Sequence, residues 1–295
     1  RSSPPCHTSD LPPAPRVLRN LRAATDGRLR LYPNPTAEKL RTKLAQLHRC
    51  QPEQIIVGNG SEGILAFIAR AFLHGDDEVI TSKGAFPAFS ILCRTRNIEP
   101  KAVDLRGFRF DLPAMASQIN DRTKIIYLCN PNNPTGTFFT RQEFDQFMSL
   151  VPERVLVLLD EAYFEFAQSI PDYPDSMDYR YDNVITLRTF SKCYGLAGFR
   201  VGYGFGHPQL IQSLWKVKLP FQPTHLAQVA AVAALEDENF LQMTVDLNAQ
   251  GRQQLSKGLR DLGFQVIPSC TNFVACQLAS ATEAGEVTDQ LLKSG

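Results

Sequence analysis

Two short apolar runs that end in polar residues constrain the fold of this chain most strongly. The first covers residues 124–129 and leads into residues 130–136, whose sequence is Asn-Pro-Asn-Asn-Pro-Thr-Gly. The second covers residues 155–159 and ends in Asp160 and Glu161. Continuous apolar runs of this length are typical of strands that are buried on both faces of a parallel sheet. Strand and helix patterns alternate from about residue 36 to residue 235, which predicts one large α/β domain with a mostly parallel sheet.

The polar residues after these runs are candidates for a binding site, because ligands of open α/β sheets bind at the carboxyl ends of the strands. Asp160 can present its carboxylate there, or it can cap the helix that follows. Asn133 precedes a proline, which restricts its backbone and orients its side-chain amide. The same Asn, Pro and Gly composition also fits an ordinary turn.

A glycine-rich turn, residues 58–63, lies between a predicted strand at residues 54–57 and a helical pattern that reaches Phe72. Such a turn can bind a phosphate through backbone amides and the helix N-terminus. Gly60 and Ser61 are the candidates in this turn, although the pattern alone is common.

Residues 189–200 contain the candidate for covalent chemistry. Lys192 follows the hydroxyl of Ser191, glycines come after it, and Arg200 lies eight positions further on. A lysine that forms a Schiff base must lose its proton readily, and glycines let the backbone approach a ligand closely. The alternative is that Ser-Lys is an exposed dipeptide without a chemical role.

These four motifs, in this order, resemble those of the fold-type I pyridoxal-phosphate-dependent aminotransferases. Within that group the chain is similar to the histidinol-phosphate aminotransferases, from about Tyr32 to the last residue. The resemblance is carried mainly by residues 160–166, 187–192 with the glycines that follow, 219–228 and 271–273.

The resemblance implies transamination with pyridoxal 5′-phosphate, in which the cofactor supplies the organic chemistry. Lys192 is then expected to bind the cofactor as a Schiff base and to move a proton between the substrate Cα and the cofactor. Asp160 is expected to pair with the pyridinium nitrogen. Asn133 and Tyr163 are expected to hydrogen-bond the oxygen of the ring 3-hydroxyl.

The resemblance also implies how the rest of the cofactor is bound. The amides of Gly60 and Ser61, together with the side chains of Ser191 and Arg200, are expected to hold the phosphate, since an arginine fork can bind two oxygens. Phe86 occupies the position of a ring that stacks on the cofactor, or is an ordinary core phenylalanine.

Tyr32 matches a tyrosine that reaches the phosphate of the partner subunit, which implies a homodimer with shared sites. Tyr32 lies in a Tyr-Pro loop, so simple packing on the surface is the alternative.

The expected organisation is an extended N-terminal arm (1–30), a large cofactor-binding domain (31–240) and part of a small α/β domain (241–295). Five prolines within residues 1–15 favour an extended or disordered arm. Two departures from the family are expected to affect the substrate site. Residues 8–12 do not match the segment that covers the active site, and the strand, loop and helix with a carboxylate-binding arginine do not occur before Gly295. A fragment and a degenerate relative are both compatible with this.

Composition agrees with an enzyme and excludes other classes. With 43% hydrophobic residues and a net charge of +1, the chain can bury a large core and has no bias toward nucleic acid or membrane surfaces. Its seven cysteines lack the spacing of a metal or disulfide framework, which favours a reducing cytoplasm, and its five histidines form no ligand pattern. No metal is expected.

Three hypotheses for function follow. The first is transamination between histidinol phosphate and 2-oxoglutarate in histidine biosynthesis. The second is another reaction on the same scaffold, either decarboxylation of a phosphorylated amino acid such as threonine phosphate or transamination of aromatic substrates. The third is a non-catalytic relative or fragment.

Overall fold

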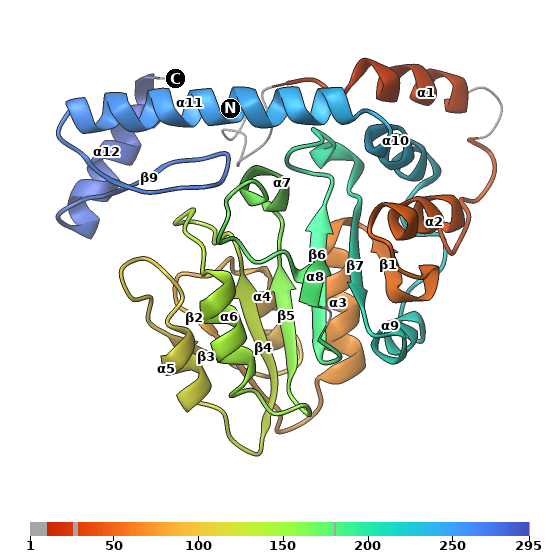
Figure 1. Ribbon diagram of the computed structural model, residues 1–295, viewed down its shortest axis with the longest axis horizontal. Helices are drawn as coiled ribbons and strands as arrows, with labels where there is room; N and C mark the ends of the chain where they lie inside the picture. The colour runs from red at the N-terminus through yellow and green to blue at the C-terminus, as the bar shows by residue number, and fades with distance from the viewer. Residues whose placement is uncertain (1–10, 26–28, 180, 295) are drawn as a thin grey trace.

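The computed structural model describes residues 11–25, 29–179 and 181–294. A sheet of seven strands in the order β1-β7-β6-β5-β4-β2-β3 forms its centre (Figure 1). Strand β7 is antiparallel to both of its neighbours, β1 and β6, and the other pairs of adjacent strands in this sheet are parallel. The predicted α/β class with a mostly parallel sheet is therefore confirmed. The strands are β1 (Ile55–Gly58), β2 (Glu78–Ser82), β3 (Lys101–Val103), β4 (Thr123–Cys129), β5 (Leu156–Asp160), β6 (Val184–Thr189) and β7 (Gly202–Gly206).

Helices cover both faces of this sheet, as the alternating pattern predicts. In Figure 1, α6 lies in front of the sheet and α3 behind it. The helices and 3-10 turns of this part are α2 (Glu38–Leu47), η1 (Pro52–Gln54), α3 (Gly60–Phe72), α4 (Ala88–Arg94), α5 (Leu112–Ser117), α6 (Arg141–Met148), α7 (Phe164–Ala167), α8 (Ser176–Tyr179), η2 (Ala197–Phe199), α9 (Pro208–Trp215) and α10 (His225–Leu235).

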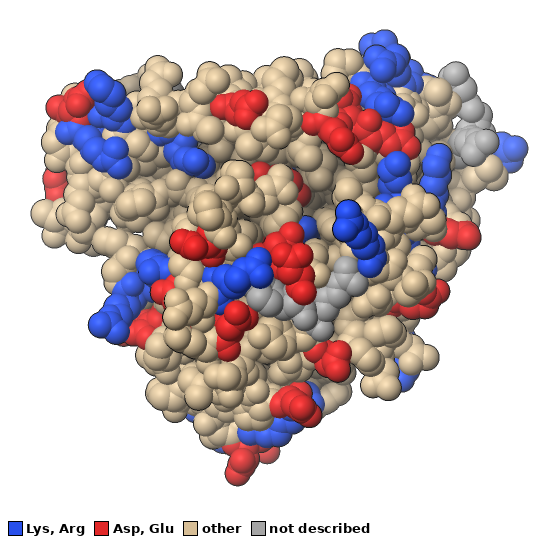
Figure 2. All heavy atoms as spheres, viewed as in Figure 1, with Lys and Arg blue, Asp and Glu red and all other residues tan. Residues whose placement is uncertain are grey.

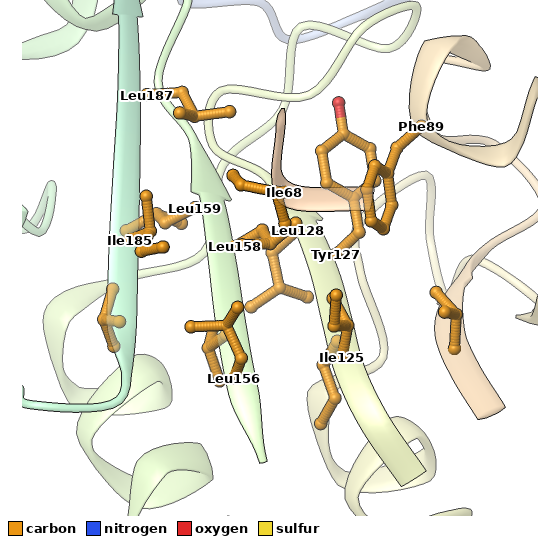
Figure 3. Close-up of a cluster of buried hydrophobic side chains, with 14 of the residues drawn as sticks. Ile68, Phe89, Ile125, Tyr127, Leu128, Leu156, Leu158, Leu159, Ile185 and Leu187 are labelled. Atoms are coloured by element: carbon orange, nitrogen blue, oxygen red, sulfur yellow. The ribbon is translucent and has the colours of Figure 1, made fainter. Parts of the chain in front are cut away.

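The core is built on β4, β5 and β6, whose side chains are buried on both faces. Figure 3 shows aliphatic side chains of these strands packed with Ile68 of α3 and Phe89 of α4. The register places Tyr127 opposite Leu158 and Cys129 opposite Asp160. Burial of such side chains contributes about 1.5–3 kcal/mol each, so the core fixes where the polar ends of the strands lie.

The sequence also sets where individual helices begin. Thr140 caps α6: its hydroxyl accepts from the amide of Glu143, and the Glu143 carboxylate accepts from the Thr140 amide. This is a capping box, and it satisfies amides that the first helical turn leaves without partners. It starts α6 directly after the Asn-Pro loop and so limits the length of that loop.

The N-terminal part differs from the extended arm expected over residues 1–30. Its described residues contain helix α1 (Pro15–Thr25), which packs against α10. Val17 is fully buried and Ala24 nearly so, because residues at helical spacing face α10. Pro15 suits a first helical turn, where its missing N–H costs nothing. Residues 1–10 and 26–28 of the expected arm lie outside the described residues.

The C-terminal part is built separately from the large sheet. Helix α11 (Glu238–Asp261) leads into the antiparallel pair β8 (Gln265–Ile267) and β9 (Ala275–Gln277), followed by α12 (Ala281–Ser294). In Figure 1, α11 lies across the carboxyl ends of β5 and β6. On the face seen in Figure 2, charges of both signs are interspersed, in keeping with the net charge of +1.

Candidate active site

A cavity of about 110 Å³ opens at the carboxyl ends of β4, β5 and β6, beside the N-terminus of α3. All predicted site residues except Gly60 and Tyr32 line it. The predicted residues in the lining are Ser61, Phe86, Asn133, Asp160, Tyr163, Ser191, Lys192 and Arg200; the others are Glu62, Cys129, Pro131, Ala162 and Thr189. Motifs more than a hundred residues apart in sequence therefore meet in one place, as the strand-end rule for parallel sheets predicts.

Asp160 ends β5 at the floor of this cavity and is 5% exposed. The Tyr127 hydroxyl donates to its Oδ2 at 2.9 Å, and the Ala162 amide donates to its Oδ1 at 3.1 Å. Burial raises the pKa of Asp160 to about 6, while these two hydrogen bonds and the charge of Lys192 act in the opposite direction. The carboxylate is thus held in one orientation and is best stabilised by a cationic group.

The N-cap position of α7 is Tyr163 and no side chain caps it, so Asp160 does not cap the helix that follows. Its contact with the Ala162 amide supports the turn that follows β5, and its carboxyl group also lines the cavity. Tyr127 was not predicted as a site residue. The sequence feature that could have pointed to Tyr127 is its position in β4, two residues before Cys129. Cys129 lies opposite Asp160 in the register of β4 with β5.

Lys192, Tyr163 and Asn133 line the same cavity as Asp160. The Lys192 Nζ lies 5.3 Å from the centroid of the Tyr163 ring, and the Asn133 Nδ2 donates to the Tyr163 hydroxyl at 3.2 Å. Tyr163 is 3% exposed, and the Phe273 ring packs edge-on against it with centroids 5.3 Å apart. The Tyr163 hydroxyl and the Asn133 amide therefore lie next to Lys192 in the cavity, and packing against Phe273 holds the Tyr163 ring in place.

The other end of the cavity has the features of an anion site. Gly60 begins α3 with φ +75°, and a Cβ added there would lie 2.9 Å from Nη2 of Arg200. Only glycine therefore lets the guanidinium lie against the first turn of the helix. The side chain of Asn59 caps no amide of this turn, so backbone donors remain for a ligand.

Hydroxyl groups and the guanidinium complete this end. The Ser191 amide donates to the Thr189 hydroxyl at 3.1 Å, and the Thr189 hydroxyl donates to Ser191 Oγ at 3.0 Å. Arg200 has φ +51°, a left-handed conformation that turns its side chain back toward Ser191, with Nη1 3.5 Å from Ser191 Oγ. Helix amides, a serine hydroxyl and an arginine together fit a phosphate group.

An ion-pair network centred on a buried arginine joins β6 to the segment that follows β5. Arg188 of β6, 2% exposed, donates from Nε to Oε2 of Glu161 at 2.8 Å and from Nη2 to Oδ1 of Asp175 at 2.8 Å. Its guanidinium also lies 3.3 Å from the centroid of the Phe164 ring. The network connects the segment that follows Asp160 with the strand that leads to Lys192, and sequence reasoning did not assign it a role.

Tyr32 lies away from the cavity of its own chain. Its side chain is 81% exposed and stacks on Phe221 with ring centroids 4.4 Å apart. Phe86, in contrast, both lines the cavity and packs against the main hydrophobic core, so it matches parts of both interpretations given for it.

Within the described ranges, no group of three or more His, Cys, Asp or Glu residues could hold a metal ion. That part of the chain contains six cysteines, and no disulfide joins any two of them. None of the helices in the described ranges combines the length and the apolar character that a membrane span requires.

The fold and the cavity define a class I and II aminotransferase. The family model for aminotransferase class I and II matches residues 3–295, and the chain belongs to this family. It is 39% identical over 284 residues to histidinol-phosphate aminotransferase 2 of Carboxydothermus hydrogenoformans, covering 96% of this chain and 78% of that protein. It is 43% identical over 266 residues to histidinol-phosphate aminotransferase 2 of Hydrogenovibrio crunogenus, covering 90% and 70%.

Solved structures agree. The crystal structure of histidinol-phosphate aminotransferase from Sinorhizobium meliloti in complex with pyridoxal-5′-phosphate superimposes with a TM-score of 0.93. The two are 32% identical, and the match covers 98% of this chain and 79% of that one. The expected family is therefore confirmed, and the α/β fold is like that of aspartate aminotransferase.

Proposed function

We propose that this chain is a pyridoxal-phosphate-dependent transaminase that acts on histidinol phosphate and 2-oxoglutarate, in histidine biosynthesis. The observation that carries the proposal is the meeting of Lys192, Asp160 and Arg200 in one cavity, whose two ends suit a cationic ring and a phosphate. Relatives about 40% identical over most of the chain are histidinol-phosphate aminotransferases. These two lines of support are independent, since one rests on geometry and the other on similarity.

The residues present fit the cofactor. Asp160 is buried, keeps a fixed orientation and is stabilised by a positive partner, which a protonated ring nitrogen provides. The Asn133 amide lies 3.2 Å from the Tyr163 hydroxyl, and both groups are proposed to donate to the ring oxygen. Bound in this way, pyridoxal phosphate supplies an electron sink for the bonds at the substrate Cα.

The phosphate is proposed to lie against the first turn of α3. The amides of Gly60 and Ser61, the Ser191 hydroxyl and the Arg200 guanidinium are its donors. Phe86 is proposed to contact the face of the ring from the opposite wall. A phosphate held at several points fixes the rest of the molecule relative to Lys192.

Lys192 is proposed to bind the cofactor covalently and to carry a proton to and from the substrate Cα. A general base must lie within reach of the proton it moves. Lys192 meets this condition because it projects into the cavity beside Tyr163, across from the carboxyl group of Asp160. Tyr163 supports it by presenting a hydroxyl whose orientation Asn133 restricts.

We further propose a cytoplasmic homodimer with shared sites. Tyr32 and its neighbours Leu29 and Leu31 are exposed, as are Leu219 and Phe221, so these two segments offer apolar surface near each other. A second copy that covers this surface would bring Tyr32 toward the phosphate site of its partner.

The proposed division of the chain is an N-terminal arm (1–30), a large domain (31–240) and part of a small domain (241–295). The separate pairing of β8 and β9, away from the seven-stranded sheet, supports the second boundary. Helix α1 is then a helical part of the arm that packs on the large domain.

The test of function is an amino-transfer assay with purified protein, pyridoxal phosphate, histidinol phosphate and 2-oxoglutarate. Glutamate should form, at a higher kcat/KM than with phenylalanine or tyrosine as donor. Preference for an aromatic donor, or release of CO₂ from threonine phosphate, would instead support the second hypothesis, another reaction on the same scaffold. Cofactor binding without any turnover would favour a non-catalytic relative.

A further inference from the structure

One acidic side chain occupies the anion site described above. Glu62 is the third residue of α3, and its Oε2 lies 3.0 Å from Nη2 of Arg200. Both side chains are about half exposed, at 51% and 48%, and both line the cavity. A carboxylate therefore holds the guanidinium that a phosphate is proposed to bind.

A role in helix stability does not account for this contact. An acid in the first turn interacts favourably with the helix dipole wherever it points. Glu238 occupies the corresponding first turn of α11 and is exposed there, outside the cavity lining. Among the residues that the structure describes, only Glu62 combines such a position with an ion pair inside the proposed cofactor site.

Arg200 also has other contacts that orient it. Its Nη1 donates to the Ala197 carbonyl oxygen at 3.2 Å and lies 3.5 Å from Ser191 Oγ. Its left-handed backbone directs the side chain across Gly60. The guanidinium thus keeps its place without the carboxylate, and what Glu62 adds to the site is mainly negative charge.

We propose that Glu62 competes with the cofactor phosphate for Arg200, and so limits how tightly the site binds a phosphate. The inference rests on the proposed function, because it assumes that the phosphate of pyridoxal phosphate binds at the first turn of α3. Before loading, the carboxylate neutralises the arginine. During loading it must release at least part of the guanidinium to the phosphate oxygens.

The expected size of the effect follows from Coulomb's law and from exposure. A like charge within a few ångströms of a phosphate dianion opposes binding, and water and salt weaken that repulsion at a half-exposed site. Replacing the carboxylate by a neutral amide should therefore tighten phosphate binding by about three- to tenfold.

The experiment measures equilibrium binding of inorganic phosphate, and separately of pyridoxal phosphate, to the cofactor-free protein by calorimetry. Glu62→Gln should bind both more tightly than the unmodified protein. The matched control Glu238→Gln removes one charge from another first helical turn and should bind as the unmodified protein does. The gain in Glu62→Gln should shrink as salt is raised from low ionic strength, which a purely structural effect would not produce.

A second readout uses Asp160. Burial is the main cause of its raised pKa, and the charge of Glu62 adds to it. The pKa of Asp160, followed by NMR, should therefore fall in Glu62→Gln and stay unchanged in Glu238→Gln.

Unchanged or weaker phosphate binding by Glu62→Gln would overturn the inference, as would a failure of both proteins to bind phosphate. The proposed function fails by a different result: pyridoxal phosphate that binds without involving Lys192, or no transamination by a protein that binds it. A tighter phosphate site in Glu62→Gln without transamination would support the inference and contradict the proposed function.

Discussion

The floor of the cavity and the C-terminal part of the chain are built in contrasting ways. The floor lies at the ends of β4, β5 and β6, whose side chains are almost entirely buried, and Arg188 of β6 is paired there with Glu161. Strands β8 and β9 have three residues each, and α12 has no buried residue. The first region is fixed by packing on both faces, whereas the second is covered on one side at most.

Because of this difference, the two regions are suited to different roles. Chemistry that depends on distances within a few tenths of an ångström needs groups held by a packed core, as Asp160 and Lys192 are. Elements with few buried apolar contacts open more readily. The predictions below separate the two regions, beginning with the largest expected effect.

Asp160→Ala should leave pyridoxal phosphate bound while turnover falls by about three orders of magnitude. The reason is that the ring nitrogen loses the charge that stabilises its protonated form, an electrostatic contribution of the size typical of active sites. Cofactor occupancy by absorbance and kcat for histidinol phosphate check this. A near-normal rate would return Asp160 to a purely structural role.

Arg188→Met should lower the free energy of unfolding by about 3–5 kcal/mol, since it leaves the buried carboxylate of Glu161 without its cation. The matched change in the C-terminal part is Lys257→Met, which breaks the exposed pair with Asp261 and should cost less than about 1 kcal/mol. Urea unfolding of both variants measures the difference. Equal decreases in the free energy of unfolding of the two variants would contradict the proposed difference between the two regions.

The same leucine-to-alanine change should have different costs in the two regions. Leu158 in β5 is fully buried, and Leu158→Ala should cost about 2–5 kcal/mol because it opens a cavity. Leu291 in α12 is 67% exposed, and Leu291→Ala should cost less than about 0.5 kcal/mol. Thermal unfolding of the two variants tests the pair, and a large loss from Leu291→Ala would show packing on α12 that this structure lacks.

A smaller effect on the free energy of unfolding, which depends on pH, is expected from Glu165. Burial raises the pKa of this carboxyl group, which is 4% exposed, to about 7. Between about pH 4.5 and pH 7 the unfolded chain releases this proton and the folded chain keeps it, so stability falls as pH rises through that window. Burial also raises the pKa of Glu161 to about 7 and that of Asp160 to about 6, so Glu165→Gln should remove only the part of the slope that Glu165 contributes. The same change should raise stability at pH 8 by about 1–3 kcal/mol.

The control for Glu165 is Glu286→Gln in α12, whose side chain is exposed and which should change neither the slope nor the stability at pH 8. Urea unfolding at pH 5 and pH 8 provides both values. A Glu165→Gln variant that keeps the full pH slope would place the buried proton on another group.

Much of this site was predictable, because each motif followed an apolar run and parallel strands end at the same edge of a sheet. Asp160 and Asn133 were found in this way. Tyr127 and Arg188 were not, since they lie inside apolar runs where side-chain direction depends on the register with the next strand. The contact of Glu62 with Arg200 joins residues 138 positions apart, which no local pattern encodes.

The fold was predicted with one clear exception. The alternation of strand and helix patterns predicted the large α/β domain. The prolines of residues 1–15 suggested an extended arm, so helix α1 was not predicted. That helix depends on packing against α10, a segment about 200 residues away in sequence. Tertiary contacts of this kind outweigh local composition.

The most direct test of the account is where pyridoxal phosphate becomes attached. Protein loaded with the cofactor is reduced with borohydride, digested and examined by mass spectrometry. The account predicts that the added mass lies on the peptide that contains Lys192, and that Lys192→Ala carries none at stoichiometric level. Attachment to a different lysine, or an unchanged amount of label in Lys192→Ala, would contradict the claim that the ends of β5 and β6 form the catalytic centre.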